Sequence, residues 1–198
     1  MCAKCRKVLL LELILYGVST VCFATEEELI FGRFGKVTLY YETPHPSQVV
    51  LFVSGDGGWN LGVIDMAKAL TSLNALVVGI DIVSYVKQLA QSTEKCSYPA
   101  ADFEALSQFV QKKLQFTNYL TPVLVGYSSG ATLVYATLVQ APSTIFRGAI
   151  SLGFCPDLPC RNLDPALVNS IELKGGHRIG SNFTGIADQI LKEAEKHE

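Results

Sequence analysis

The sequence predicts an α/β protein with a mostly parallel sheet between two helical layers. Short apolar runs alternate with amphipathic segments of ten or more residues, and turns rich in Gly and Pro separate them. With 49% hydrophobic and 17% charged residues among 198, the chain can bury the core of one domain. Because a helix carries the chain back between successive strands, this alternation favours parallel pairing.

The first half of the chain contains three predicted strands and one predicted helix. Residues 36–41 are rich in β-branched and aromatic side chains, and turn residues that include two prolines follow them. Residues 48–54 and 75–82 are apolar runs of the kind expected for strands covered on both faces. Between these runs, residues 61–73 carry apolar side chains at helical spacing.

The second half continues the same alternation. Residues 99–114 carry Phe, Leu and Val at steps of three and four, which indicates an amphipathic helix. Residues 122–125 are predicted to be a strand covered on both faces, the third after 48–54 and 75–82. A turn leads from it into a predicted helix over residues 131–140. The remaining predicted elements are strands over residues 148–152 and 170–173 and a helix over residues 183–196.

The N-terminal residues have the order of a secretory signal peptide. Three basic residues precede an apolar run over residues 8–18, and small side chains precede an expected cleavage site after Ala24. We therefore expect residues 1–24 to be removed and residues 25–198 to form one exported domain. An uncleaved N-terminal anchor is the alternative, although Glu12 would be costly in a permanent transmembrane helix.

Charge and cysteine content indicate which partners and cofactors are not expected. The formal net charge is -2 and the 16 Lys and Arg residues are scattered, so nucleic acid is not an expected partner. Cys96, Cys155 and Cys160 remain in the expected mature chain and allow one disulfide, in any of three pairings. No second pair of Cys or His has the spacing of a zinc site. We expect neither a metal nor another cofactor.

The motif Gly-Tyr-Ser-Ser-Gly at 126–130 lies where a predicted strand meets a predicted helix, the setting of a nucleophile elbow. A serine hydroxyl is a weak nucleophile and must be held on a sharp turn where a base can reach it. The helix behind Ser128 offers N–H groups and its positive end to a developing negative charge. We therefore predict Ser128 as the nucleophile, with Tyr127 beside it as a lining residue.

The base and the acid are expected after the nucleophile in the chain. His177 follows a predicted strand and precedes the last helix, whereas His45 lies in an early Pro-rich loop and His197 adjoins the C-terminus. His177 is therefore the predicted base. Asp157 is the favoured acid because it closely follows the 148–152 strand, and Asp164, which also fits a helix N-cap, remains the alternative.

The loop Gly-Asp-Gly-Gly-Trp at 55–59 follows the 48–54 strand, where a second oxyanion donor is expected. The backbone N–H of Asp56 or Gly57, together with that of Ser129, would stabilise the oxyanion. The Asp56 carboxylate is alternatively a contact for a cationic substrate group. Trp59 is a further candidate for lining the substrate site.

These motifs together resemble the AcvB/VirJ family of bacterial virulence proteins, which are exported and have an α/β-hydrolase fold. The stretches that carry the resemblance are LFVSGDGGWN at 51–60, CSYPAADFEALSQFVQKKL at 96–114, PVLVGYSSGATLVYATLVQAP at 122–142 and RGAISLGFCPDLP at 147–159. The resemblance implies a periplasmic serine hydrolase. Its AcvB branch implies hydrolysis of the aminoacyl ester of lysyl-phosphatidylglycerol, and its VirJ branch implies an association with virulence secretion.

The chain departs from the family pattern in its C-terminal third, which is shortened by about one strand and the loop that bears the acid. Two hypotheses follow. The first is a serine esterase that acts on an aminoacylated phospholipid or another ester at a membrane surface. The second is a catalytically silent periplasmic protein that binds or assembles with components of a secretion system.

Overall fold

The structure is a computed structural model and describes residues 24–93, 96–153 and 182–195. No helix in these ranges is both long enough and apolar enough to span a bilayer. The expected signal peptide, the expected strand over residues 170–173, Cys155 and Cys160 lie outside the described residues. Cys96 is exposed in the segment before a helix.

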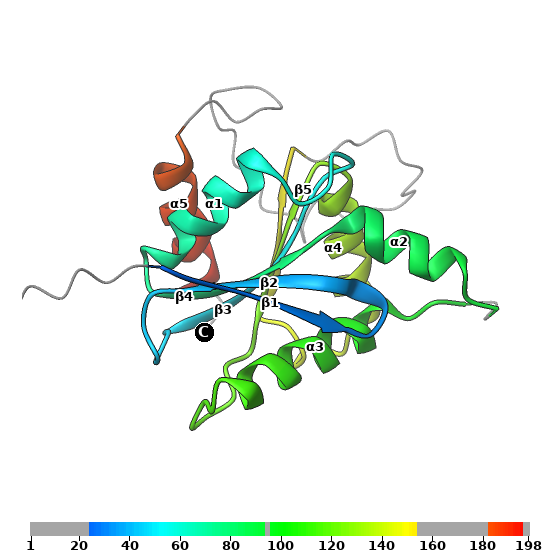
Figure 1. Ribbon diagram of the computed structural model, residues 1–198, viewed down its shortest axis with the longest axis horizontal. Coiled ribbons are helices and arrows are strands. Elements are labelled where there is room, and N and C mark those ends of the chain that lie inside the picture. Colours follow the sequence, from blue (N-terminus) through cyan, green and yellow to red (C-terminus); the bar gives the residue numbers. More distant parts are fainter. Residues whose placement is uncertain (1–23, 94–95, 154–181, 196–198) are drawn as a thin grey trace, which may run out of the picture.

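The described residues contain a six-stranded sheet (Figure 1). Its strands are β1 (Thr25–Phe31), β2 (Gly35–Tyr41), β3 (Gln48–Val53), β4 (Ala75–Ile80), β5 (Val123–Tyr127) and β6 (Gly148–Leu152). Their order across the sheet is β1-β2-β4-β3-β5-β6. β4, β3, β5 and β6 run parallel, while β1 and β2 pair antiparallel with each other and β2 pairs antiparallel with β4.

Helices cover both faces of this sheet. They are α1 (Leu61–Thr71), α2 (Ile82–Ala90), α3 (Pro99–Lys113), α4 (Ser129–Gln140) and α5 (Phe183–Glu195). Figure 1 shows α1 and α5 together on one side of the sheet, with α2, α3 and α4 on the other. The fold is therefore α/β with a mostly parallel sheet between two helical layers, as the sequence predicts.

The alternation of side chains along β3 explains why its whole sequence is apolar. Leu51 and Val53 pack into the core beneath α2, α3 and α4, while Val50 and Phe52 pack into the core beneath α1 and α5. Successive side chains of a strand point to opposite faces. Both faces are covered here, so none of these four side chains is more than 1% exposed.

Three elements were not predicted from the sequence: β1, the 3-10 turn that follows it, and α2. β1 precedes the first predicted strand and joins it through a short 3-10 turn, η1 (Gly32–Phe34), which makes the pair antiparallel. The strand predicted over residues 75–82 ends at Ile80, because the Asp81 carboxylate accepts hydrogen bonds from the Val83 and Ser84 amides and caps α2.

Candidate active site

Ser128 occupies a sharp turn between β5 and α4. Its backbone has φ 55° and ψ -120°, a combination that a residue with a side chain rarely adopts and that stores strain of about 1–3 kcal/mol. Two backbone hydrogen bonds hold the turn: the Ser128 amide donates to the Leu152 carbonyl of β6 at 2.9 Å, and the Ala131 amide donates to the Ser128 carbonyl at 2.9 Å. The turn is therefore hydrogen-bonded both to the sheet and to the first turn of α4.

The glycines on either side of Ser128 make this turn possible. A Cβ at Gly126 would lie 2.2 Å from the Gly130 carbonyl oxygen. A Cβ at Gly130 would lie 2.4 Å from the Ser54 carbonyl oxygen at the end of β3. Both distances are far below contact, so the first turn of α4 can pack on β3 and β5 only where these side chains are missing.

Residues 55–58, which we call the glycine loop, lie directly against the Ser128 turn. A Cβ at Gly55 would be 3.0 Å from the Ser128 Cβ. Inside the loop the Gly58 amide donates to the Gly55 carbonyl at 2.9 Å, and the Asn60 side-chain amide donates to the Gly57 carbonyl at 2.6 Å. Since the Gly58 amide is used within the turn, Asp56 and Gly57 remain the expected oxyanion donors of this loop.

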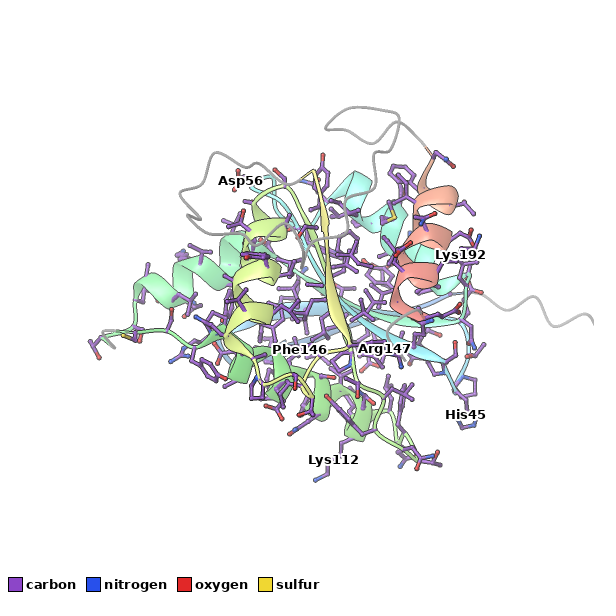
Figure 2. All side chains as sticks on the ribbon, turned by 180° about the vertical axis from the view of Figure 1, so that it is seen from behind. His45, Asp56, Lys112, Phe146, Arg147 and Lys192 are labelled. Carbon is purple, nitrogen blue, oxygen red and sulfur yellow. The ribbon has the colours of Figure 1, made fainter. Side chains whose placement is uncertain are left out.

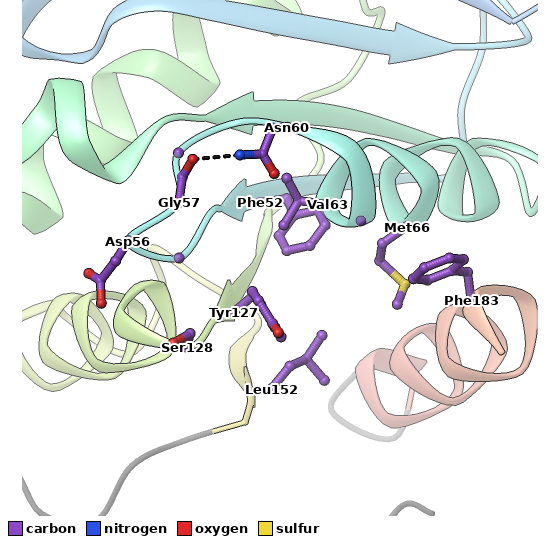
Figure 3. Close-up of a pocket in the computed structure, with 13 residues that line it drawn as sticks. Phe52, Asp56, Gly57, Asn60, Val63, Met66, Tyr127, Ser128, Leu152 and Phe183 are labelled. Atoms are coloured by element: carbon purple, nitrogen blue, oxygen red, sulfur yellow. Dashed lines mark hydrogen bonds between the residues drawn. The ribbon is translucent and has the colours of Figure 1, made fainter. Parts of the chain in front are cut away.

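A cavity of about 620 Å³ opens at Ser128 (Figure 3). Asp56, Gly57 and Tyr127 line it beside Ser128. Apolar side chains form much of the remaining wall: Phe52, Val63, Met66, Leu152 and Phe183. In the view of Figure 3, Ser128 lies between the Asp56 carboxylate and the Met66–Phe183 pair, so the cavity has a charged end and an apolar end.

The structure brings four of the predicted site residues together, namely Asp56, Gly57, Tyr127 and Ser128. Ser129 begins α4 directly behind Ser128, so its amide is at the helix N-terminus, while its hydroxyl oxygen is buried without a hydrogen-bond partner. His177, Asp157 and the alternative Asp164 lie outside the described residues.

Trp59 does not line the Ser128 cavity. Its indole lies over Gly79 of β4 and packs edge-to-face on Phe52, with ring centroids 5.5 Å apart. It lines a separate cavity of about 240 Å³ together with Tyr40 and Asp81. The structure therefore gives no support to the expected substrate contact of Trp59.

His45 lies far from the Ser128 turn. It belongs to the loop between β2 and β3, and Figure 2 shows it at the opposite end of the molecule from Asp56. This position agrees with the sequence argument that excluded His45 as the base.

Sequence reasoning missed three contributions to the site. Asn60 fixes the glycine loop, and an Asx residue directly before a helix was a local signal for such a role. Met66 and Phe183 form the apolar end of the cavity, although α1 and α5 are more than one hundred residues apart in the chain. Nothing local in the sequence indicates that these two helices meet. Among the described residues no three His, Cys, Asp or Glu side chains converge as a metal site requires.

Solved structures that resemble this one include several hydrolases. The dienelactone hydrolase of Anabaena variabilis matches 88% of this chain and 81% of its own, with 15% identity and a TM-score of 0.51. Poly(aspartic acid) hydrolase-1 of Sphingomonas sp. KT-1 matches 65% of this chain and 56% of its own, with 14% identity and a TM-score of 0.52. A lipase in its open form matches with 20% identity and a TM-score of 0.43 over 64% of this chain, which spans 43% of the lipase. The fold is that of the α/β-hydrolases.

Sequence comparison assigns the family. A search of curated proteins finds no match. A family model described as bacterial virulence protein (VirJ) matches residues 47–150. The matched segment contains the glycine loop, the Ser128 turn, the parallel strands β3, β4 and β5, and the start of β6. The chain belongs to the bacterial virulence protein (VirJ) family.

Proposed function

We propose that this protein is a periplasmic serine hydrolase that cleaves a carboxylic ester. The observation that carries the proposal is the backbone of Ser128, at φ 55° and ψ -120° between a parallel strand and a helix, beside a cavity of about 620 Å³. A strained turn of this kind is retained where it presents a side chain for chemistry.

The proposed reaction has two steps. The Ser128 oxygen attacks the ester carbonyl while His177 takes its proton, and the alcohol leaves with a proton returned by His177. Water then attacks the acyl-enzyme and releases the acid and the Ser128 hydroxyl. The amide of Asp56 or Gly57 and the amide of Ser129 stabilise the negative oxygen in each tetrahedral intermediate. No cofactor takes part in either step.

The order of the histidines in the chain, together with the location of His45, supports His177 as the base. His45 is excluded by its place at the far end of the molecule. His177 and His197 are the other two histidines of the chain, and His177 follows the motif in the order expected for this fold. Asp157 would hold the imidazole tautomer and stabilise the imidazolium that forms.

The substrate that we propose is the aminoacyl ester of lysyl-phosphatidylglycerol, taken from a membrane surface. The charge at one end of the cavity supports this choice, because the exposed Asp56 carboxylate suits a cationic acyl group. The apolar end, with Met66 and Phe183, suits the hydrocarbon of a lipid. Membership of a virulence family is compatible with secretion-system partners.

The first experiment compares wild type with Ser128→Ala on a chromogenic ester and on lysyl-phosphatidylglycerol in vesicles. We expect the variant to lose about three orders of magnitude or more in kcat, and a fluorophosphonate probe to label only the wild type. Ser72→Ala is the matched control, because Ser72 is an exposed serine at the end of α1, away from the cavity. Equal rates for Ser128→Ala and wild type would refute the proposal, and absence of labelling would favour a catalytically silent binding or assembly protein.

A second set of variants tests the base and the acid. We expect His177→Ala to abolish labelling of Ser128, and Asp157→Asn to slow it more than Asp164→Asn does. The reverse order for the two aspartates would assign Asp164 as the acid.

A further inference from the structure

Trp59, the single tryptophan of the chain, directly follows the glycine loop and is fixed to the sheet beneath it. A Cβ at Gly79 would lie 2.2 Å from the indole Cζ2, so the missing side chain of Gly79 makes room for the ring. The indole also packs edge-to-face on the Phe52 ring of β3, with ring centroids 5.5 Å apart. The indole therefore rests on two neighbouring strands of the sheet.

Hydrogen bonds fix the orientation of this indole. Its Nε1 donates to the Tyr40 hydroxyl at 3.1 Å, and the Tyr40 hydroxyl donates to a Glu26 carboxylate oxygen at 3.4 Å. An indole N–H can only donate, so a buried acceptor at this position selects one orientation of the ring. Tyr40 is 1% exposed on β2 and Glu26 lies on β1, so the chain of bonds joins the glycine loop to the N-terminal strand pair.

We propose that Trp59 is a positioning residue for the oxyanion site. Held by Gly79 and Tyr40, its indole keeps the glycine loop at the separation from Ser128 that the loop amides need to stabilise a negative oxygen. The inference rests on the proposed serine chemistry. It also explains why an aromatic residue of the motif turns away from the cavity: its contacts are with the sheet, not with the substrate.

The close packing of the loop makes its position sensitive to this anchor. A Cβ at Gly55 would be 3.0 Å from the Ser128 Cβ, so the loop backbone lies against the turn with no space for a side chain between them. A shift of the loop away from the turn would lengthen the distance between its amides and the oxyanion. A displacement of about 1 Å can lower a rate about a hundredfold.

Two variants that break the Trp59–Tyr40 hydrogen bond test the proposal. Trp59→Phe loses the N–H donor and Tyr40→Phe loses its acceptor, while each keeps an aromatic ring. Since neither side chain lines the Ser128 cavity, we expect kcat for a chromogenic ester to fall about tenfold with KM nearly unchanged. Because both variants break the same bond, the double variant should cost no more than Trp59→Phe alone.

Tyr119→Phe is the matched control. It also removes a hydrogen-bonded phenol, since the Tyr119 hydroxyl donates to Ser107 at 3.1 Å, but it lies on α3's side of the sheet and lines neither cavity described above. Since Tyr119 is 47% exposed and Tyr40 only 1%, we expect this control to lower the melting temperature less than Tyr40→Phe does and to leave kcat unchanged. If Tyr40→Phe and Trp59→Phe lower kcat no more than this control does, the positioning role is overturned.

Tryptophan fluorescence separates a failure of this inference from a failure of the proposed function. Trp59 is the only source of tryptophan emission, so acrylamide quenching reports directly on its environment. We expect stronger quenching in Tyr40→Phe than in wild type and no change in Tyr119→Phe. Unchanged quenching in Tyr40→Phe would refute the role of Tyr40 in fixing Trp59, even if the wild type proved inactive. An inactive wild type would by itself refute only the proposed hydrolase function.

Discussion

At the scale of single residues, the Ser128 turn depends on backbone segments that pack so closely that only glycine fits between them. Gly130 is the tightest contact with the neighbouring strand, because a Cβ there would meet the Ser54 and Val53 carbonyl oxygens at 2.4 and 2.6 Å. These are backbone atoms of a central strand and cannot move aside as the end of a flexible side chain would. The backbone geometry of Ser128 is therefore tied to the core of the sheet.

We predict that Gly130→Ala destabilises the protein by about 1–3 kcal/mol, because the added methyl forces α4 away from β3. Urea unfolding measures the loss, and slower fluorophosphonate labelling would report the displaced serine. Gly148→Ala is the control, since a Cβ at Gly148 meets nothing within 4 Å. Equal stability losses for the two variants would contradict this account of the turn.

The Ser128 turn could be predicted from the sequence. The direction of the Trp59 side chain, which faces the sheet and not the cavity, could not. The glycines of the motif are required by contacts within a few residues of Ser128, so the pattern itself carries the geometry. The direction of the Trp59 ring depends on Gly79 and Tyr40, which are about twenty residues away on either side and on separate strands. Only the pairing of β2 with β4 brings these residues together.

At the scale of elements, the boundary between β4 and α2 is set by one side chain. The Asp81 carboxylate accepts from the Val83 amide at 2.8 Å and from the Ser84 amide at 3.3 Å. Residues 82 and 83 are β-branched and continue the apolar pattern of the strand, so without the cap their sequence favours further extension. This is why the sequence predicted a strand through residue 82.

We predict that Asp81→Ala lowers the free energy of unfolding by about 1 kcal/mol through loss of this cap. Asp81→Asn should lose far less, because an amide oxygen caps a helix about as well as a carboxylate does. Urea titrations of the two variants and the wild type provide the measurement. If the two substitutions were equally costly, the charge of Asp81 rather than its capping oxygen would be the stabilising feature.

β1 was not predicted because its local sequence opposes a strand. Glu26, Glu27 and Glu28 have low strand propensity, and three adjacent acids resemble a solvated segment. Pairing with β2 along the whole strand and the packing of Leu29 and Phe31 against the core overcome this preference, and the ion pairs of Glu28 with Lys36 and of Glu27 with Lys113 add little to it. Strand pairing and core packing are not visible in the residues of β1 alone, whereas the buried parallel strands carry their signal within their own residues.

At the scale of the whole molecule, Tyr85 joins the N-terminal strand pair to two helices. Its side chain on α2 is fully buried, stacks on Phe34 with ring centroids 4.6 Å apart, and donates to the Asp102 carboxylate of α3 at 2.8 Å. Arg33 completes the connection through an ion pair with Asp102 at 3.2 Å. Burial, and secondly the neighbouring Asp102 carboxylate, raise the pKa of the Tyr85 phenol well above its usual range.

This raised pKa predicts how stability depends on alkaline pH. Below about pH 10 the phenol is protonated in both the folded and the unfolded chain, and Tyr85 adds no pH dependence. Above about pH 10 the unfolded chain releases the proton while the folded protein keeps it, so the free energy of unfolding falls as pH rises. The contribution of this one group reaches about 1.4 kcal/mol per pH unit.

We therefore predict that Tyr85→Phe and wild type have different pH profiles in urea unfolding. At pH 7 the variant should be less stable by about 1 kcal/mol, because the hydrogen bond to Asp102 is lost. Above about pH 10 its stability should decline less steeply than that of the wild type, so the two profiles converge. Lysines also titrate in this range but are common to both proteins, so the difference between the profiles isolates Tyr85. Parallel profiles from pH 7 to pH 11 would show that the fold does not hold the phenol protonated.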